Sequence, residues 1–93
     1  MTDETKLQQD INKGNRAKFL LEDPVLKEAF EIMEREMVEA WAASPARDVN
    51  GRENAFKMVH AIRKTRDLLH SYVANGKIAD AEIRAALRLK AVA

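Results

Sequence analysis

The two histidines are the side chains with the most obvious capacity for metal binding or proton transfer. His60 and His70 stand ten residues apart, whereas a pair of metal ligands on one helix needs the spacing of a single turn, and no His-Glu-x-x-His sequence occurs. His60 falls beside the apolar face of its predicted helix, so we expect a packed or rim position. His70 is expected to be exposed. The histidines therefore predict no metal site.

Carboxylates are frequent between residues 24 and 43, at Glu28, Glu31, Glu34, Glu36 and Glu39. They are distributed around the predicted helix between Lys and Arg residues, as on a solvated face. No other segment offers the inward Glu-x-x-His partner of a di-iron site. The chain has no cysteine, which excludes disulfides, thiolate ligands and thiol nucleophiles. Glycine-rich phosphate loops and Gly-x-Ser-x-Gly are also absent. We predict no catalytic, metal or cofactor-binding residues, and no enzyme.

A basic strip is the strongest binding signal in the sequence, and it consists of Lys57, Arg63, Lys64 and Arg66. One explanation is an ordinary solvated face whose positive charge complements the acidic helix beside it. The other is contact with a partner, either an acidic protein surface or the phosphates of double-stranded DNA. Against DNA, the strip has no interleaved aromatic residues, and its helix is longer than a usual recognition helix. These residues remain candidates for partner or nucleic-acid contact.

The composition predicts an all-α protein. The 93 residues suffice for one domain at most, and they are 46% hydrophobic and 33% charged, with three Gly and two Pro. Strong helix formers dominate, and sheet-forming residues are few. The net charge of +1 gives no overall reason to expect nucleic acid. However, residues 22–43 hold seven acids and two bases, whereas residues 52–75 hold five bases and two acids.

The first long helix is predicted over residues 24–43. Asp23 can cap it, and Pro24 occupies the first helical position, where a missing N–H costs nothing. Its apolar residues recur at alternating steps of four and three, at Leu26, Phe30, Met33, Met37 and Ala40. Ser44-Pro45 ends the helix.

The second long helix is predicted over residues 52–75, with Asn50 and Glu53 forming a capping box. Its seam also alternates in steps of four and three, through Ala55, Val59, Ile62, Arg66, Leu69 and Val73. Asn75-Gly76 is expected to end it. A shorter helix is predicted over residues 80–90, with Ile83, Ala86 and Leu87 on one face.

Two such helices joined by a short connection favour a long antiparallel helical hairpin with short flanking helices. The N-terminal flank is a short helix over residues 16–22. It follows a flexible arm over residues 1–15, for which the alternative is a frayed helix that ends at Gly14. Residues 16–93 then form a single helical domain.

The apolar surface exceeds what one hairpin can bury. Phe19, Leu20, Trp41 and Phe56 need something to pack on, so we predict that they form an oligomer interface and that the protein is a homo-oligomer. In the connection, Arg47, Asp48 and Arg52 are expected to fix the loop, for example through an Asp48–Arg52 ion pair. A contact of Arg47 or Asp48 with a partner is the alternative.

No membrane partner is predicted, since no apolar run approaches the ~20 residues of a membrane-spanning helix. The sequence begins Met1-Thr2-Asp3-Glu4-Thr5, which is unlike a signal peptide. We therefore expect a soluble protein that is not exported by the usual route.

Several sequence blocks over residues 16–78 resemble small proteins of tailed bacteriophages and prophages that are encoded among head and DNA-packaging genes. The blocks are Arg16-Ala17-Lys18, Leu20-Leu21-Glu22-Asp23-Pro24-Val25-Leu26-Lys27-Glu28-Ala29-Phe30-Glu31, Trp41, Ser44-Pro45-Ala46-Arg47-Asp48, Gly51-Arg52-Glu53 and Asn75-Gly76-Lys77. The resemblance implies a setting, particle assembly or DNA packaging, and it carries no catalytic residues.

Three hypotheses follow from the resemblance and the residues together. The first is a non-enzymatic virion or assembly component, an oligomer that binds phage head or portal proteins. The second is a small terminase-like packaging subunit that binds double-stranded DNA. The third is a small phage modulator of a host protein. The expected location is the host cytoplasm during assembly, or the virion.

Overall fold

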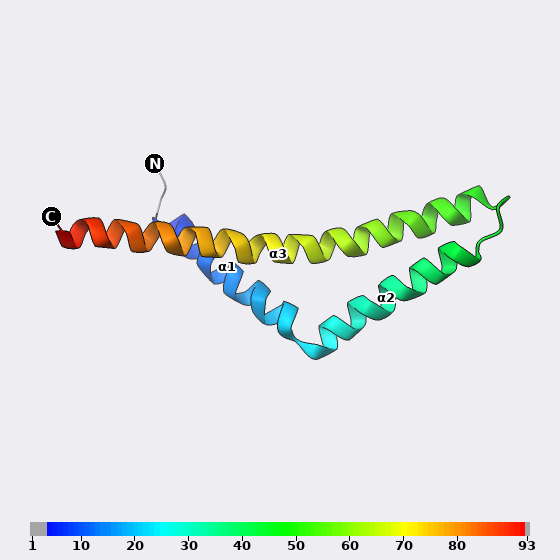
Figure 1. The fold of residues 1–93 in the computed structure, drawn as a ribbon, viewed down its shortest axis with the longest axis horizontal. Coiled ribbons are helices and arrows are strands. Elements are labelled where there is room, and N and C mark those ends of the chain that lie inside the picture. The colour runs from blue at the N-terminus through cyan, green and yellow to red at the C-terminus, as the bar shows by residue number, and fades with distance from the viewer. Residues whose placement is uncertain (1–3, 93) are drawn as a thin grey trace. The chain divides into compact units, whose positions relative to one another are not determined.

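The computed structural model describes residues 4–92, which form three α-helices and no strand (Figure 1). Helix α1 spans Glu4–Glu22, α2 spans Pro24–Ala43 and α3 spans Val49–Val92. The predicted all-α class is therefore confirmed. Within this range, no helix combines the length and apolar character that crossing a membrane requires.

Helix α2 has the bounds that its sequence predicts. The Asp23 carboxylate accepts hydrogen bonds from the backbone N–H groups of Val25 (2.9 Å) and Leu26 (3.1 Å), with Pro24 in the first turn. At the other end Ser44 takes an extended conformation, which is the conformation that a following proline favours. Its hydroxyl donates to the Ala40 carbonyl oxygen at 2.7 Å. Both ends are thus fixed by local chemistry.

Helix α3 corrects the prediction of two separate helices over residues 52–75 and 80–90, because it is one helix of 44 residues. Asn75-Gly76 does not end it, and Gly76 does not adopt the positive φ of a helix-terminating glycine. The helix also begins before Arg52, at Val49, with Asp48 rather than Asn50 as its cap: the Asp48 carboxylate accepts from the Gly51 backbone N–H at 3.0 Å.

Helix α1 corrects the prediction of a flexible arm followed by a short helix over residues 16–22. Residues 4–15, predicted as part of the arm, belong to the same helix as residues 16–22. Gly14 lies inside this helix and is buried, together with Ala17. The first three residues of the predicted arm lie outside the described residues.

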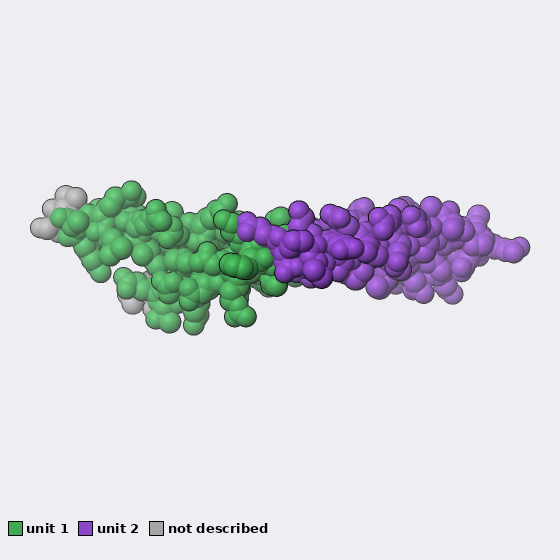
Figure 2. Space-filling model, turned by 90° about the horizontal axis from the view of Figure 1, so that it is seen from below, with its two compact units in different colours: residues 1–21, 68–93 green, residues 22–67 purple. Residues whose placement is uncertain are grey.

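The chain forms two compact units (Figure 2). Unit 1 comprises residues 1–21 and 68–93, so it contains most of α1 and the C-terminal part of α3. Unit 2 comprises residues 22–67, with α2 and the N-terminal part of α3. The single domain predicted over residues 16–93 stays a prediction, since α3 contributes to both units.

Unit 1 packs through small residues at which two backbones meet. A Cβ atom added to Gly14 would lie 2.8 Å from the Tyr72 carbonyl oxygen and 3.1 Å from the Gly76 Cα atom. One turn further along each helix, Ala17 and Ala79 are each 2% exposed. The face predicted for residues 80–90 is wrong in part, because Ile83 is half-buried whereas Ala86 and Leu87 are exposed.

Unit 2 packs through larger side chains. The buried residues are Phe30 of α2 and Ala55, Val59 and Ile62 of α3, so the first part of the predicted α3 seam is confirmed. The predicted α2 seam is wrong at two positions. Met33 and Ala40 are exposed, whereas Glu34 is half-buried, because its carboxylate is held by two arginines of α3.

Candidate functional site

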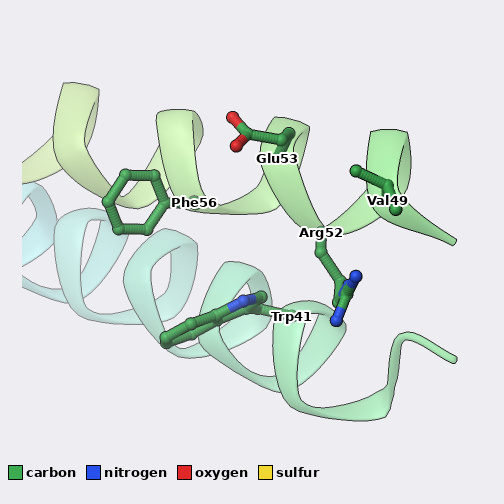
Figure 3. Close-up of a pocket in the computed structure, with 5 residues that line it drawn as sticks. All are labelled: Trp41, Val49, Arg52, Glu53 and Phe56. Atoms are coloured by element: carbon green, nitrogen blue, oxygen red, sulfur yellow. The ribbon is translucent and has the colours of Figure 1, made fainter. Parts of the chain in front are cut away.

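An aromatic pocket of unit 2 lies between the end of α2 and the beginning of α3 (Figure 3). Its volume is ≈ 260 Å³, and its lining consists of Trp41, Val49, Arg52, Glu53 and Phe56. The Trp41 and Phe56 ring centroids are 6.2 Å apart, with the ring planes tilted by 58°. Each side chain still leaves 46% of its surface exposed. The two rings therefore contact each other without completing a core.

His60 extends this aromatic group along α3, one turn after Phe56. Its ring centroid lies 4.3 Å from that of Phe56, in an edge-to-face arrangement. Edge-to-face contacts suit the quadrupole of aromatic rings. The histidine predicted as a packed or rim residue is thus an exposed member of an aromatic surface, and His70 is exposed further along the same helix.

Arg52 brings an unusual polar group to the aromatic pocket. Its Nε atom is buried and has no hydrogen-bond partner within residues 4–92. Figure 3 shows its side chain extending toward Trp41. A buried donor without an acceptor is unfavourable by about 1–3 kcal/mol. A partner's carbonyl or carboxylate oxygen would remove that cost once the Arg52 side chain turns to expose this N–H.

The connection before α3 is fixed by Asp48. Its backbone N–H donates to the Pro45 carbonyl oxygen at 2.9 Å, and its own carbonyl oxygen accepts from the Arg52 N–H at 3.1 Å. Its carboxylate caps the helix at Gly51 rather than pairing with the Arg52 guanidinium. Arg47 lies exposed in the turn. Of the three residues predicted to fix this connection, Asp48 therefore contributes most of the hydrogen bonds.

The basic strip is divided by contacts inside unit 2. Arg63 Nε donates to Glu34 Oε1 at 2.5 Å, and Arg66 Nη2 donates to Glu34 Oε2 at 2.6 Å. The Arg66 guanidinium also lies 5.9 Å from the Phe30 ring centroid. Lys57 and Lys64 are exposed. The strip therefore presents two lysines to a partner, while its arginines hold α2 and α3 together.

Glu34 was expected on a solvated face, and the structure corrects that expectation. Hydrogen bonds from Arg63 and then Arg66 lower the pKa of its carboxyl group below the ordinary value, against a smaller opposing effect of burial. One feature of the sequence could have indicated this position of Glu34. Arg66 lies in the predicted seam of α3, where its guanidinium requires an acceptor on the facing helix. Steps of four, three and four from Phe30 reach Glu34, Met37 and Trp41.

The four residues predicted as an oligomer interface fall in different units. Trp41 and Phe56 meet in unit 2. Leu20 lines a hollow of unit 1, and Phe19 is 82% exposed on α1. Within residues 4–92 no group of three or more His, Asp or Glu side chains could hold a metal ion. The aromatic pocket is therefore the candidate functional site. Two of its lining residues, Val49 and Glu53, were not predicted as site residues.

Comparison with known proteins found no similarity: no protein-family model, no curated protein and no solved structure matches this chain.

Proposed function

We propose that this protein is a non-enzymatic assembly component of tailed-phage particles, which self-associates and binds a head or portal protein. The phage setting comes from the resemblance of residues 16–78 to small head- and packaging-gene products. The molecular role, binding another protein, is supported by the surface chemistry of unit 2.

The observation that carries the binding role is the half-exposed aromatic pair Trp41 and Phe56 beside the buried, unpartnered Arg52 Nε. Tryptophan, tyrosine and arginine dominate the energetically important contacts of protein interfaces. A partner that packs one apolar side chain against the exposed parts of the two rings, and turns Arg52 toward an oxygen of its own, would satisfy both groups. Small-molecule binding fits less well, because five residues line this open pocket and drug-sized ligands favour deeper, mostly enclosed sites.

We interpret unit 2 as the predicted helical hairpin, reduced to α2 and the first part of α3. The order of its contacts supports two antiparallel helices, since Glu34 meets Arg63 and Arg66 whereas the later Trp41 meets the earlier Phe56. Such a hairpin places the aromatic pocket next to its Ser44–Asp48 connection. A helical tip of this kind suits insertion into a groove of a partner.

The packaging-subunit hypothesis has less support. DNA affinity depends on the number of phosphates that Lys and Arg neutralise, and two of the four cations in the basic strip are already paired with Glu34. No observation favours the third hypothesis, a modulator of a host protein.

The test is whether the protein co-purifies with phage particles and whether this depends on its aromatic pocket. Particles purified from cells that express the protein are analysed by mass spectrometry, with the natural chain, Trp41→Ser or the control Met58→Ser. Met58 is 51% exposed in the same unit and lies outside the pocket. We expect the natural chain and the Met58→Ser variant to be recovered with particles and the Trp41→Ser variant to be lost at least tenfold.

The opposite results have distinct meanings. If the natural chain is absent from particles and from assembly intermediates, the virion role is wrong. If the chain is present and the Trp41→Ser variant is recovered equally well, the role stands and the aromatic pocket is the wrong surface. Circular dichroism of each variant establishes that its helices are intact.

A further inference from the structure

Large apolar side chains are exposed in both units. Phe19 of unit 1 is 82% exposed, and Val25 and Trp41 of unit 2 are 75% and 46% exposed. Exposed apolar surface of this kind is a feature of protein interaction sites.

One part of this surface is a slot in unit 1 with an apolar floor. Ala17 and Leu20 of α1 and Leu69 and Tyr72 of α3 form the floor of a hollow of ≈ 390 Å³. We call it the α1–α3 slot. Leu20 is 48% exposed, so water now covers apolar area that a partner could exclude.

The rim of the α1–α3 slot is polar and positively charged. Gln9, Asn12, Lys13 and Arg16 line it, and no acidic residue does. The Lys13 ammonium group lies 5.1 Å from the Tyr72 ring centroid, over the floor. Apolar lining beside two cations of α1 suits an amphipathic helix that carries carboxylates next to its apolar side chains.

Helix α2 carries such a line on the face turned away from its buried seam. Val25, Ala29 and Ile32 follow one another at steps of four and three, and Val25 is 75% exposed. Glu36 occupies the next position of this line and Glu28 lies beside it; both are exposed, as is Ala29, whereas Ile32 is half-buried. Spacing of this kind is how a helix presents anchors to an apolar groove.

We propose that the α1–α3 slot receives the outer face of α2 from a second copy of the chain, with Lys13 and Arg16 of one copy facing Glu28 and Glu36 of the other. The inference rests on the self-association in the proposed function and names its contact. Apolar burial provides the affinity. The charge pairing sets register and partner choice, because like charges brought together in that position cost several kcal/mol.

The contact joins two different surfaces of the chain. The slot and α2 share no residue, so each copy offers both surfaces. Such a contact gives a closed ring if the rotation between copies closes, and an open chain if it does not. A two-fold dimer with two equivalent contacts is the smallest closed form.

The test is a charge exchange read by light scattering coupled to size exclusion. One variant carries Lys13→Glu with Arg16→Glu, a second carries Glu28→Lys with Glu36→Lys, and a third carries all four changes. Lys57→Glu with Lys64→Glu is the control for the first variant, because it makes the same change of charge on residues outside the contact. All six residues are exposed, so folding should survive, and circular dichroism verifies that the helices are intact.

We expect the natural chain and the control to have a mass above 10.5 kDa. Each reversal should weaken association at least about tenfold, and the four-fold variant should recover it. If the natural chain associates and both reversals leave its mass unchanged, or the four-fold variant fails to recover, the slot contact is wrong while self-association stands. If the natural chain remains a monomer at every concentration, both ideas fail.

Discussion

The two units of this protein bring helices together by opposite means. In unit 1, backbone meets backbone at Gly14 and Gly76, and the neighbouring buried residues are alanines. In unit 2, the space between the helices is filled by Phe30, by β-branched residues and by a carboxylate shared between two arginines.

The difference concerns what each contact tolerates. A contact of small residues gains little from burial of each side chain but leaves no room for an added methyl group. A contact of large residues gains more from burial and loses most when a side chain is removed. Unit 1 should therefore be sensitive to enlargement, and unit 2 to truncation.

Truncation in unit 2 should have the largest effect. Phe30→Ala removes the largest buried side chain of that unit and should lower the free energy of unfolding by about 3 kcal/mol. Phe19→Ala is the matched control, because Phe19 is 82% exposed and its loss should change stability by less than about 0.5 kcal/mol. Urea unfolding followed by circular dichroism measures both. Equal losses would contradict the assignment of Phe30 to the core.

Enlargement in unit 1 should come next. An alanine usually stabilises a helix by about 1 kcal/mol relative to glycine. Gly14→Ala should instead destabilise by about 1–2 kcal/mol, because its Cβ atom would lie 2.8 Å from the Tyr72 carbonyl oxygen. Hydrogen exchange should show the loss of protection concentrated in residues 4–21. A gain in stability would mean that the two backbones do not meet at this glycine.

A third glycine tests whether such sensitivity requires a backbone neighbour. A Cβ atom at Gly51 would overlap the Asp48 carboxylate, so Gly51→Ala should displace the cap and cost up to about 1 kcal/mol. In an Asp48→Ala background the same change should stabilise by about 0.5–1 kcal/mol. A double-mutant cycle with thermal unfolding measures the coupling. Equal effects in both backgrounds would exclude the clash.

The smallest effect concerns the polar contact of unit 2. Because arginine hydrogen bonds lower the pKa of Glu34 in the folded state, its contribution is complete above the ordinary Glu value of about 4.3. It is lost as the pH falls through the lowered value. Glu34→Gln should flatten the fall in melting temperature between about pH 5 and pH 3, whereas Glu31→Gln, at an exposed position of the same helix, should not. Identical profiles for the two variants would contradict this account.

The parts of the fold that local chemistry determines could be predicted from the sequence. Asp23-Pro24 and Ser44-Pro45 fix both ends of α2, and the α3 seam begins as its spacing predicts. Gly14 and Gly76 were misinterpreted because a glycine in isolation favours a helix end. Each is the first residue of a Gly-x-x-Ala pair. Gly76 also continues the spacing of Leu69 and Val73 in α3. Whether a glycine ends a helix or allows a second helix to approach closely depends on that second helix. The sequence around the glycine does not contain this information.

The candidate site could be predicted in part. Trp41 and Phe56 were predicted to be apolar side chains that one hairpin cannot bury, and their rings contact each other in the structure. The seam position of Glu34 was missed because apolar Met33 stands next to it and fits the same spacing. The choice between them depends on Arg63 and Arg66 of the other helix, which lie about thirty residues away in the sequence.

We propose that this chain buries its exposed apolar side chains against copies of itself. Light scattering of the natural chain, from dilute to concentrated solution, tests that claim most directly. We predict a mass that is a multiple of 10.5 kDa and falls toward one chain on dilution. A mass of 10.5 kDa at every concentration would contradict it.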